Sequence, residues 1–86
     1  MPVQEESELT VAQVYRNMGT EKQKILESAM TSVIHFERPP LNICKAIESF
    51  SRYEKSVAYY LIGEGIYYGQ RVFDILECWL ILQQYG

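Results

Sequence analysis

The sequence predicts an all-α protein, folded as a small bundle of three to four helices with a short first helix and a long third helix. Three observations favour this class. Hydrophobic residues recur at helical spacing, threonine–glutamine pairs have the spacing of N-terminal capping boxes, and Pro39–Pro40 separates two periodic segments. Of the 86 residues, 48% are hydrophobic, which is enough for one packed core. Chains this short bury only about 60–65% of their unfolded surface, so we also expect a stabilising helical homodimer.

The N-terminal segment predicts an acidic flexible tail over residues 1–9, followed by a single helical domain over residues 10–86. Glutamates are frequent in the tail, and it has no hydrophobic periodicity. Thr10 and Gln13 then have capping-box spacing, which predicts a first helix over about residues 11–18. Gly19 suits the left-handed residue that ends a helix.

The second helix is predicted by a repeat of the same capping pattern at Thr20 and Gln23. It should end before Pro39–Pro40, because proline disfavours helix in the residue ahead of it. One apolar stripe at 3.6-residue spacing runs along it: Ile25, Leu26, Ala29, Met30, Val33 and Ile34.

The long third helix should start at Asn42 as its N-cap and run to Gly63–Glu64–Gly65, which interrupts the pattern. Ile43, Phe50 and Val57 are spaced by seven residues, which is typical of a coiled-coil seam or of an ordinary amphipathic helix. A fourth helix should follow over about residues 67–84. A β-hairpin over residues 57–68 is the alternative, since aromatic and β-branched residues flank the glycines there.

Charge and motifs restrict the function classes. The net charge is −3 and the eight basic residues are scattered, which disfavours nucleic-acid binding. The alternative of a DNA-binding regulator rests on a helix-turn-helix-like segment, Thr10–Ala29, whose second helix presents charges of mixed sign. A secretion or assembly chaperone is a further alternative.

No pattern of catalytic or metal-ligating residues is recognisable, so we expect no enzyme, no cofactor and no metal. His35 ends the second helix, where a ring nitrogen can contact a backbone carbonyl. Cys44 and Cys78 lack the paired spacing of zinc ligands, and whether they pair as a disulfide stays open. The N-terminus lacks signal-peptide features and the run from Ile75 to Leu82 is too short to cross a bilayer, so we expect a soluble cytoplasmic protein with no membrane partner.

The C-terminal third carries the strongest functional signal. Tyr59–Tyr60 and Tyr67–Tyr68 are adjacent pairs, so on a helix their members cannot all face one small core. Tyrosine and tryptophan are enriched at interfaces, although the edge of a core is an alternative setting for them. We therefore expect a regulator or adaptor that binds a protein of unknown identity. The candidate interface residues are Tyr60, Tyr67, Tyr68, Phe73, Ile75, Leu76, Trp79 and Leu82.

The first half of the chain resembles a known family. The segments from Val11 to Gly19 and from Leu26 to Ile34, followed by a short loop and Leu41–Asn42, are similar to the helices of the AriR/YmgB family. These are small biofilm and acid-resistance regulators that connect to a two-component phosphorelay. The resemblance covers about residues 11–47, and it implies an all-α homodimer that binds a signalling protein. The tyrosine-rich C-terminal half departs from the family pattern.

Overall fold

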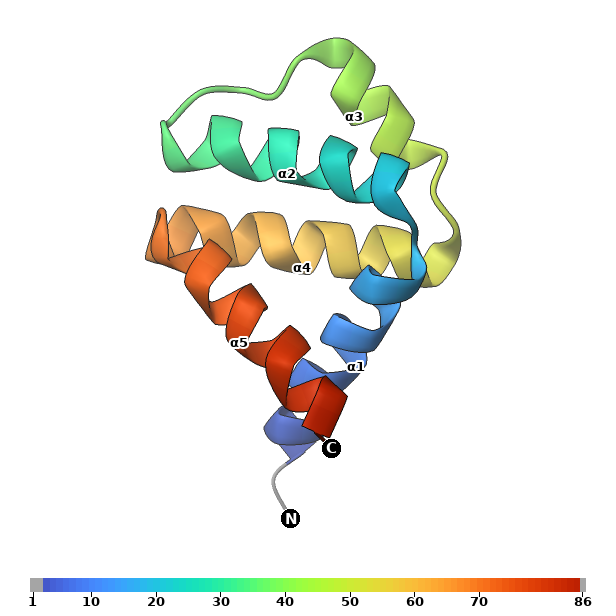
Figure 1. Ribbon diagram of the computed structural model, residues 1–86. Coiled ribbons are helices and arrows are strands. Elements are labelled where there is room, and N and C mark those ends of the chain that lie inside the picture. Colours follow the sequence, from blue (N-terminus) through green and yellow to red (C-terminus); the bar gives the residue numbers. More distant parts are fainter. Residues whose placement is uncertain (1–2, 86) are drawn as a thin grey trace.

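The structure is a computed structural model that describes the backbone of residues 3–85 and the side chains of residues 10–82. The described backbone forms five helices (Figure 1). The helices are α1 (Val3–Asn17), α2 (Thr20–Ile34), α3 (Leu41–Glu48), α4 (Arg52–Tyr68) and α5 (Arg71–Tyr85). The all-α class is confirmed, and the described backbone contains no strand. The hairpin alternative for residues 57–68 is wrong, because that segment is the main part of α4.

The helices pack around α4. It lies beside α2, and the short helix α3 covers the opposite edge of α2 (Figure 1). On the other side of α4, α1 and α5 converge and pack against each other. The first and the last helix are therefore held together by packing, and each helix touches at least two others.

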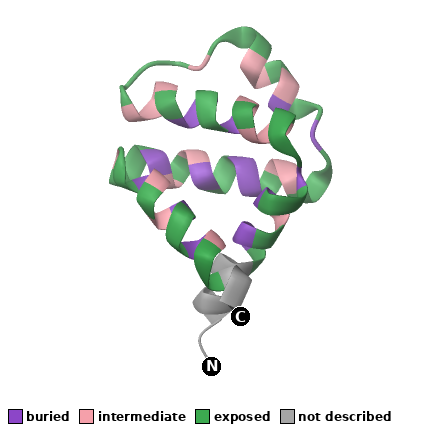
Figure 2. Ribbon diagram, in the orientation of Figure 1, coloured by how far each residue is buried: buried purple, intermediate pink, exposed green. Residues whose placement is uncertain are grey.

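One hydrophobic core unites all five helices (Figure 2). Among the described residues no polar or charged side chain is buried in it. The largest fully buried side chains come from three helices: Leu26, Met30, Leu61 and Val72. The core is therefore apolar and drawn from the whole chain.

The first two helices begin differently from the prediction. Helix α1 begins at Val3, runs through Thr10 and takes in most of the segment expected as a tail. The predicted Thr10 cap is wrong for that reason. At the start of α2 the N-cap is Gly19, at a φ of 91°, with no side-chain capping bond. Gln23 instead donates from Nε2 to the carbonyl oxygen of Tyr15, at 2.8 Å, and so ties α2 to the end of α1.

The prediction of one long third helix is also wrong, because the chain turns after Glu48 and forms two helices, α3 and α4, in its place. Helix α3 follows Pro40, not an Asn42 cap. The physical cause of the break is a capping box at the start of α4, where Ser51 Oγ accepts from the Glu54 amide and Glu54 Oε1 accepts from the Ser51 amide. Phe50 is buried in the turn between the two helices.

The expected interruption at Gly63–Glu64–Gly65 does not occur. Helix α4 continues to Tyr68 and ends at Gly69, whose φ of 62° favours glycine. Gly65 is buried where α4 meets α2, and a Cβ there would lie 3.4 Å from Val33 Cγ2 and 3.5 Å from Ile34 Cγ2. A side chain larger than alanine would therefore separate the two helices.

Candidate functional site

The side of α4 that faces away from the core is the strongest candidate surface. Val57, Ala58 and Leu61 are buried on the core side, and a helix turns by about 100° per residue. The opposite side therefore presents three rows, each at seven-residue spacing, and all their members are exposed. We call this surface the α4 outer face and define it by Tyr53, Ser56, Tyr59, Tyr60, Gly63, Ile66 and Tyr67.

The three rows differ in the size of their side chains. Ser56 and Gly63 form a middle row of small residues. The larger residues lie on either side of it, with Tyr53, Tyr60 and Tyr67 in one row and Tyr59 and Ile66 in the other. The α4 outer face thus has a central row of small residues, its floor, between two rows of larger side chains, its walls, and we call this arrangement the groove.

This surface is also poor in charge. Helix α4 has no charged residue between Lys55 and Glu64. An ordinary surface helix has charged and polar residues opposite its core face, whereas a helix that is apolar all round is usually buried. Both α4 faces are apolar, which is the pattern of a helix covered on both sides.

The predicted interface residues lie in three different settings. Tyr60, Tyr67 and Tyr68 are exposed on α4, and Leu82 is exposed on α5. Phe73 and Ile75 are partly buried against the core. Leu76 and Trp79 are buried within it.

The structure brings four of these predicted residues together in two aromatic pairs. The rings of Tyr60 and Trp79 stack with centroids 6.2 Å apart and planes at 25°. Tyr67 and Tyr68 meet edge to face, with ring centroids 4.7 Å apart. Trp79 therefore supports the α4 outer face from beneath, through Tyr60, and is itself covered by its own chain.

The predicted interface residues did not include the three other large members of this surface, Tyr53, Tyr59 and Ile66, or its small residues Ser56 and Gly63. Two signals could have found them. Tyr53, Tyr60 and Tyr67 have seven-residue spacing, and Ser51–Glu54 is a capping-box signature that sets the start of the helix. Together they place the tyrosines in one row on a helix that begins near residue 52.

A small apolar pocket adjoins the α4 outer face through Tyr59. It lies between α2, α3 and α4, has a volume of about 320 Å³, and Val33, Pro39, Ile47 and Ile62 contribute to its wall. Glu48 is the charged residue of its lining. The pocket extends the apolar surface of α4 toward α3.

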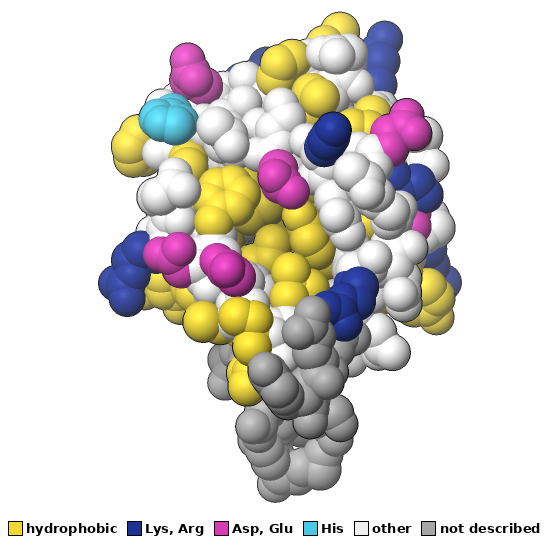
Figure 3. All heavy atoms as spheres, viewed as in Figure 1, with side chains coloured by type: hydrophobic (Ala, Val, Ile, Leu, Met, Phe, Trp, Pro, Cys, Tyr) yellow, Lys and Arg dark blue, Asp and Glu magenta, His cyan; other side chains and the backbone are white. Residues whose placement is uncertain are grey.

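Apolar side chains also gather in the face of the molecule that is turned toward the viewer in Figure 3. Figure 3 shows hydrophobic side chains gathered in a hollow between α2, α4, α5 and α1, with acidic and basic side chains on its border. Between α1 and α2, Tyr15 donates a hydrogen bond from its hydroxyl to Glu27 Oε2, at 2.8 Å. Burial of the ring, together with this carboxylate, raises the pKa of the Tyr15 phenol well above its ordinary value, so the phenol stays protonated.

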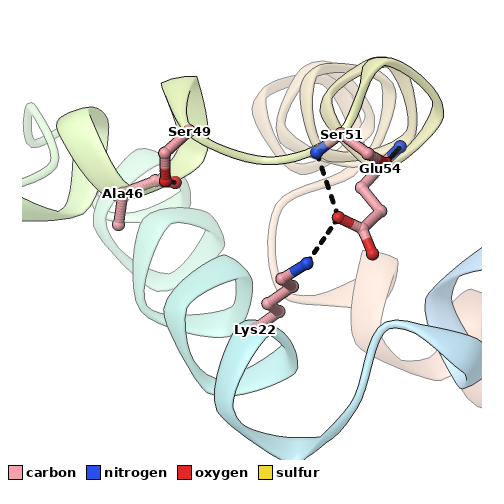
Figure 4. A network of polar contacts seen from close by, with 5 residues as sticks. All are labelled: Lys22, Ala46, Ser49, Ser51 and Glu54. Atoms are coloured by element: carbon pink, nitrogen blue, oxygen red, sulfur yellow. Dashed lines mark hydrogen bonds and ion pairs between the residues drawn. The ribbon is translucent and has the colours of Figure 1, made fainter.

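A polar network fixes the corner between α2 and α4 (Figure 4). Lys22 Nζ lies 2.7 Å from Glu54 Oε1 and 5.6 Å from the centre of the Phe50 ring. Its hydrogen bond lowers the pKa of the Glu54 carboxyl below the ordinary value of 4.5, and the Ser51 amide acts in the same direction. On the α3 side of the turn, Ser49 Oγ donates to the Ala46 carbonyl at 2.6 Å.

His35, Cys44 and Cys78 are the residues of this chain that could be considered for catalysis or metal binding. His35 Nδ1 lies 2.8 Å from the Thr31 carbonyl oxygen, which confirms the expected contact with a carbonyl at the end of α2. Cys44 and Cys78 are free thiols. Cys44 is partly buried in the wall of the pocket, and Cys78 is exposed on α5. In the described part of the chain, no three histidine, cysteine, aspartate or glutamate residues cluster in a way that could hold a metal ion.

No helix of the described chain combines the length and hydropathy needed to cross a membrane. When the chain is compared with family models, with curated proteins and with solved structures, nothing matches it.

Proposed function

We propose that this protein is a small regulatory adaptor that acts by binding proteins, including a second copy of itself. The observation that carries the proposal is the α4 outer face, which is apolar, exposed and without charge between Lys55 and Glu64. Contiguous apolar patches of this kind mark interaction sites on small proteins. Tyrosine is suited to such a site, because it buries a large ring and keeps a hydroxyl for hydrogen bonding.

The electrostatics of α2 favour protein binding over the DNA-binding alternative. Lys22 lies in the segment that would contact DNA, and its ammonium group forms a salt bridge with Glu54. The exposed charges that remain at the start and middle of α2 are Glu21, Lys24 and Glu27, which are of mixed sign. A surface of this kind neutralises few phosphates, and phosphate neutralisation supplies much of the affinity for nucleic acid.

A role in bacterial signalling or biofilm control rests on the resemblance of residues 11–47 to the AriR/YmgB family. A cytoplasmic location is supported by the free thiols of Cys44 and Cys78, since reducing compartments keep thiols unpaired. The proposed mode of action is protein binding through the α4 outer face.

The test is photo-crosslinking in cells with p-benzoylphenylalanine in place of Tyr67. Tyr67 is 80% exposed, so the probe projects from the α4 outer face without disturbing the core. The control places the same probe at Lys24, which is exposed on α2. We expect covalent adducts with protein at position 67 in clear excess over position 24, and equal yields would overturn the proposal. If most of the crosslinked protein is one hydrophobic partner, the protein is a secretion or assembly chaperone, which also acts by binding protein.

A further inference from the structure

We propose that the α4 outer face binds the same face of a second copy, with the two α4 helices antiparallel and the tyrosines of each copy lying over Ser56 and Gly63 of the other. The inference rests on the proposed function, because it names the partner that covers this surface. Four properties of the surface select a second copy: its area, its shape, the glycine in its floor and its lack of charge.

The exposed area matches one side of a stable interface. Tyr53, Tyr59, Tyr60, Ile66 and Tyr67 are 77%, 52%, 41%, 64% and 80% exposed, which together amount to about three whole side chains. At roughly 200 Å² for a large side chain, this is on the order of 600 Å². A standard interface buries about 800 Å² on each partner, so the walls of the groove and its small-residue floor supply most of one side.

The shape of the surface is complementary to itself. A two-fold interface brings the same patch together from both copies, so each large residue needs a small one opposite. When two such helices run antiparallel, the tyrosine row of one lies beside the small-residue row of the other. Tyr60 then faces Ser56 or Gly63 of the second copy. A parallel pair would set tyrosine against tyrosine and leave a gap between the small residues.

Nothing in the described part of the chain requires glycine at position 63. It lies in the interior of α4, where glycine costs roughly 1 kcal/mol relative to alanine. A Cβ at this position would meet nothing within 4 Å, whereas one at Gly65 would meet three side-chain atoms. A second helix lying in the groove supplies the missing reason, because close approach of two helices requires a small residue at the contact.

The charge pattern permits self-association. Because a two-fold interface opposes a patch to its own copy, a charged patch would repel itself. The central part of the α4 outer face has no charge, and Arg52 lies at the first residue of the helix. In an antiparallel pair the two Arg52 side chains lie at opposite ends of the contact, so no like charges meet.

The experiment is sedimentation velocity of the full chain at tens of micromolar, comparing the natural sequence with Gly63→Leu. We expect a dimer for the natural chain and at least a tenfold weaker dimer for Gly63→Leu, because the added side chain fills the groove. The matched control Ser28→Leu adds the same side chain at an exposed site on α2 and should leave the dimer intact. A monomeric natural chain, or a Gly63→Leu dimer of undiminished affinity, overturns the inference.

Two further variants keep the result interpretable. Tyr67→Glu should also weaken the dimer, because it sets a charge into an apolar contact. Circular dichroism checks that Gly63→Leu and Tyr67→Glu stay folded.

In a chain with Cys44→Ser and Cys78→Ser, Tyr53→Cys tests the relative orientation of the two α4 helices. In an antiparallel pair the two cysteines lie about ten residues, or roughly 15 Å, apart along the helix when Tyr60 faces Ser56, and about 17 residues, or roughly 25 Å, apart when it faces Gly63. Both separations are too large for a disulfide. Ready oxidation to a disulfide-linked dimer would show a parallel pair and overturn the antiparallel arrangement.

The two proposals can fail separately. If the purified chain is monomeric but Tyr67 crosslinks to another protein in cells, binding to a second copy is wrong, and binding of other proteins by the adaptor stands. If neither association is found, both are wrong.

Discussion

Phe36 shows how one residue can be held in an unfavourable conformation by its neighbours. It has a φ of 59°, and it is the non-glycine residue in the described chain with a positive φ. The Glu37 amide donates to the Ser32 carbonyl and the Phe36 amide to the Val33 carbonyl, which is the Schellman arrangement that ends α2. Glycine is the usual residue at this position because a Cβ is strained there.

The first prediction is that Phe36→Gly stabilises the fold by roughly 0.5–1 kcal/mol, because it removes this strain. The ring is 95% exposed, so its loss removes almost no packing. Urea unfolding followed by circular dichroism measures the change. Phe36→Ala is the control, since it removes the ring but keeps the Cβ, and it should leave stability within about 0.5 kcal/mol. A lower free energy of unfolding for the glycine variant would show that the ring stabilises the fold.

Helix starts and ends decide the architecture at the scale of elements. The heptad of Ile43, Phe50 and Val57 spans the turn between α3 and α4, so the pattern that predicted one long helix is shared by two. All three residues still face the hydrophobic core or its edge. Hydrophobic spacing thus predicted burial correctly, and the capping box at Ser51 determined where the helix begins.

The second prediction concerns that capping box. Ser51→Ala should lower the free energy of unfolding by about 1 kcal/mol, because it removes the side-chain acceptor of the Glu54 amide. Thermal or urea unfolding at neutral pH measures this. A loss no larger than that of Ser28→Ala, at an exposed serine inside α2, would mean that the cap does not hold the turn.

The third prediction is a pH dependence that comes from Glu54. Its pKa is lowered in the folded chain by Lys22, so its contribution to stability is present above the ordinary value of 4.5 and is lost as pH falls through the lowered folded value. The natural chain should therefore exceed Glu54→Gln in stability at pH 7, and the difference should shrink toward pH 3. Glu37→Gln, at an exposed residue outside this network, is the control. A difference that stays constant with pH would contradict the role of the charged carboxylate.

The molecule as a whole depends on a core to which every helix contributes. Trp79 is buried in the middle of α5 and joins α5 to α4 through the stacked ring of Tyr60. Because α5 also packs on α1, loss of this side chain affects the helices at both ends of the chain. A small domain has few other contacts to compensate for such a loss.

The fourth prediction follows from this placement. Trp79→Ala should lower the free energy of unfolding by about 3–5 kcal/mol, which is a large part of the total for a domain of this size. Thermal unfolding by circular dichroism should show a large fall in the midpoint temperature or loss of helix at room temperature. Leu82→Ala, at an exposed position on the same helix, should cost about 1 kcal/mol or less. Equal effects of the two changes would show that Trp79 is not a core residue.

The sequence by itself determined the helical class, the buried stripe of α2, the stop before Pro39–Pro40 and the concentration of surplus aromatic side chains in the second half. These are local properties, since the spacing of apolar residues and the conformational limits of proline act within a few residues. Only the tertiary structure decided that Trp79 and Leu76 lie in the core while Tyr67 and Tyr53 lie outside it. The physical reason is that each helix has one core face, and the direction of that face depends on which other helices it packs against. The same packing lets Gly65 stay helical against α2 and leaves Gly63 in open space.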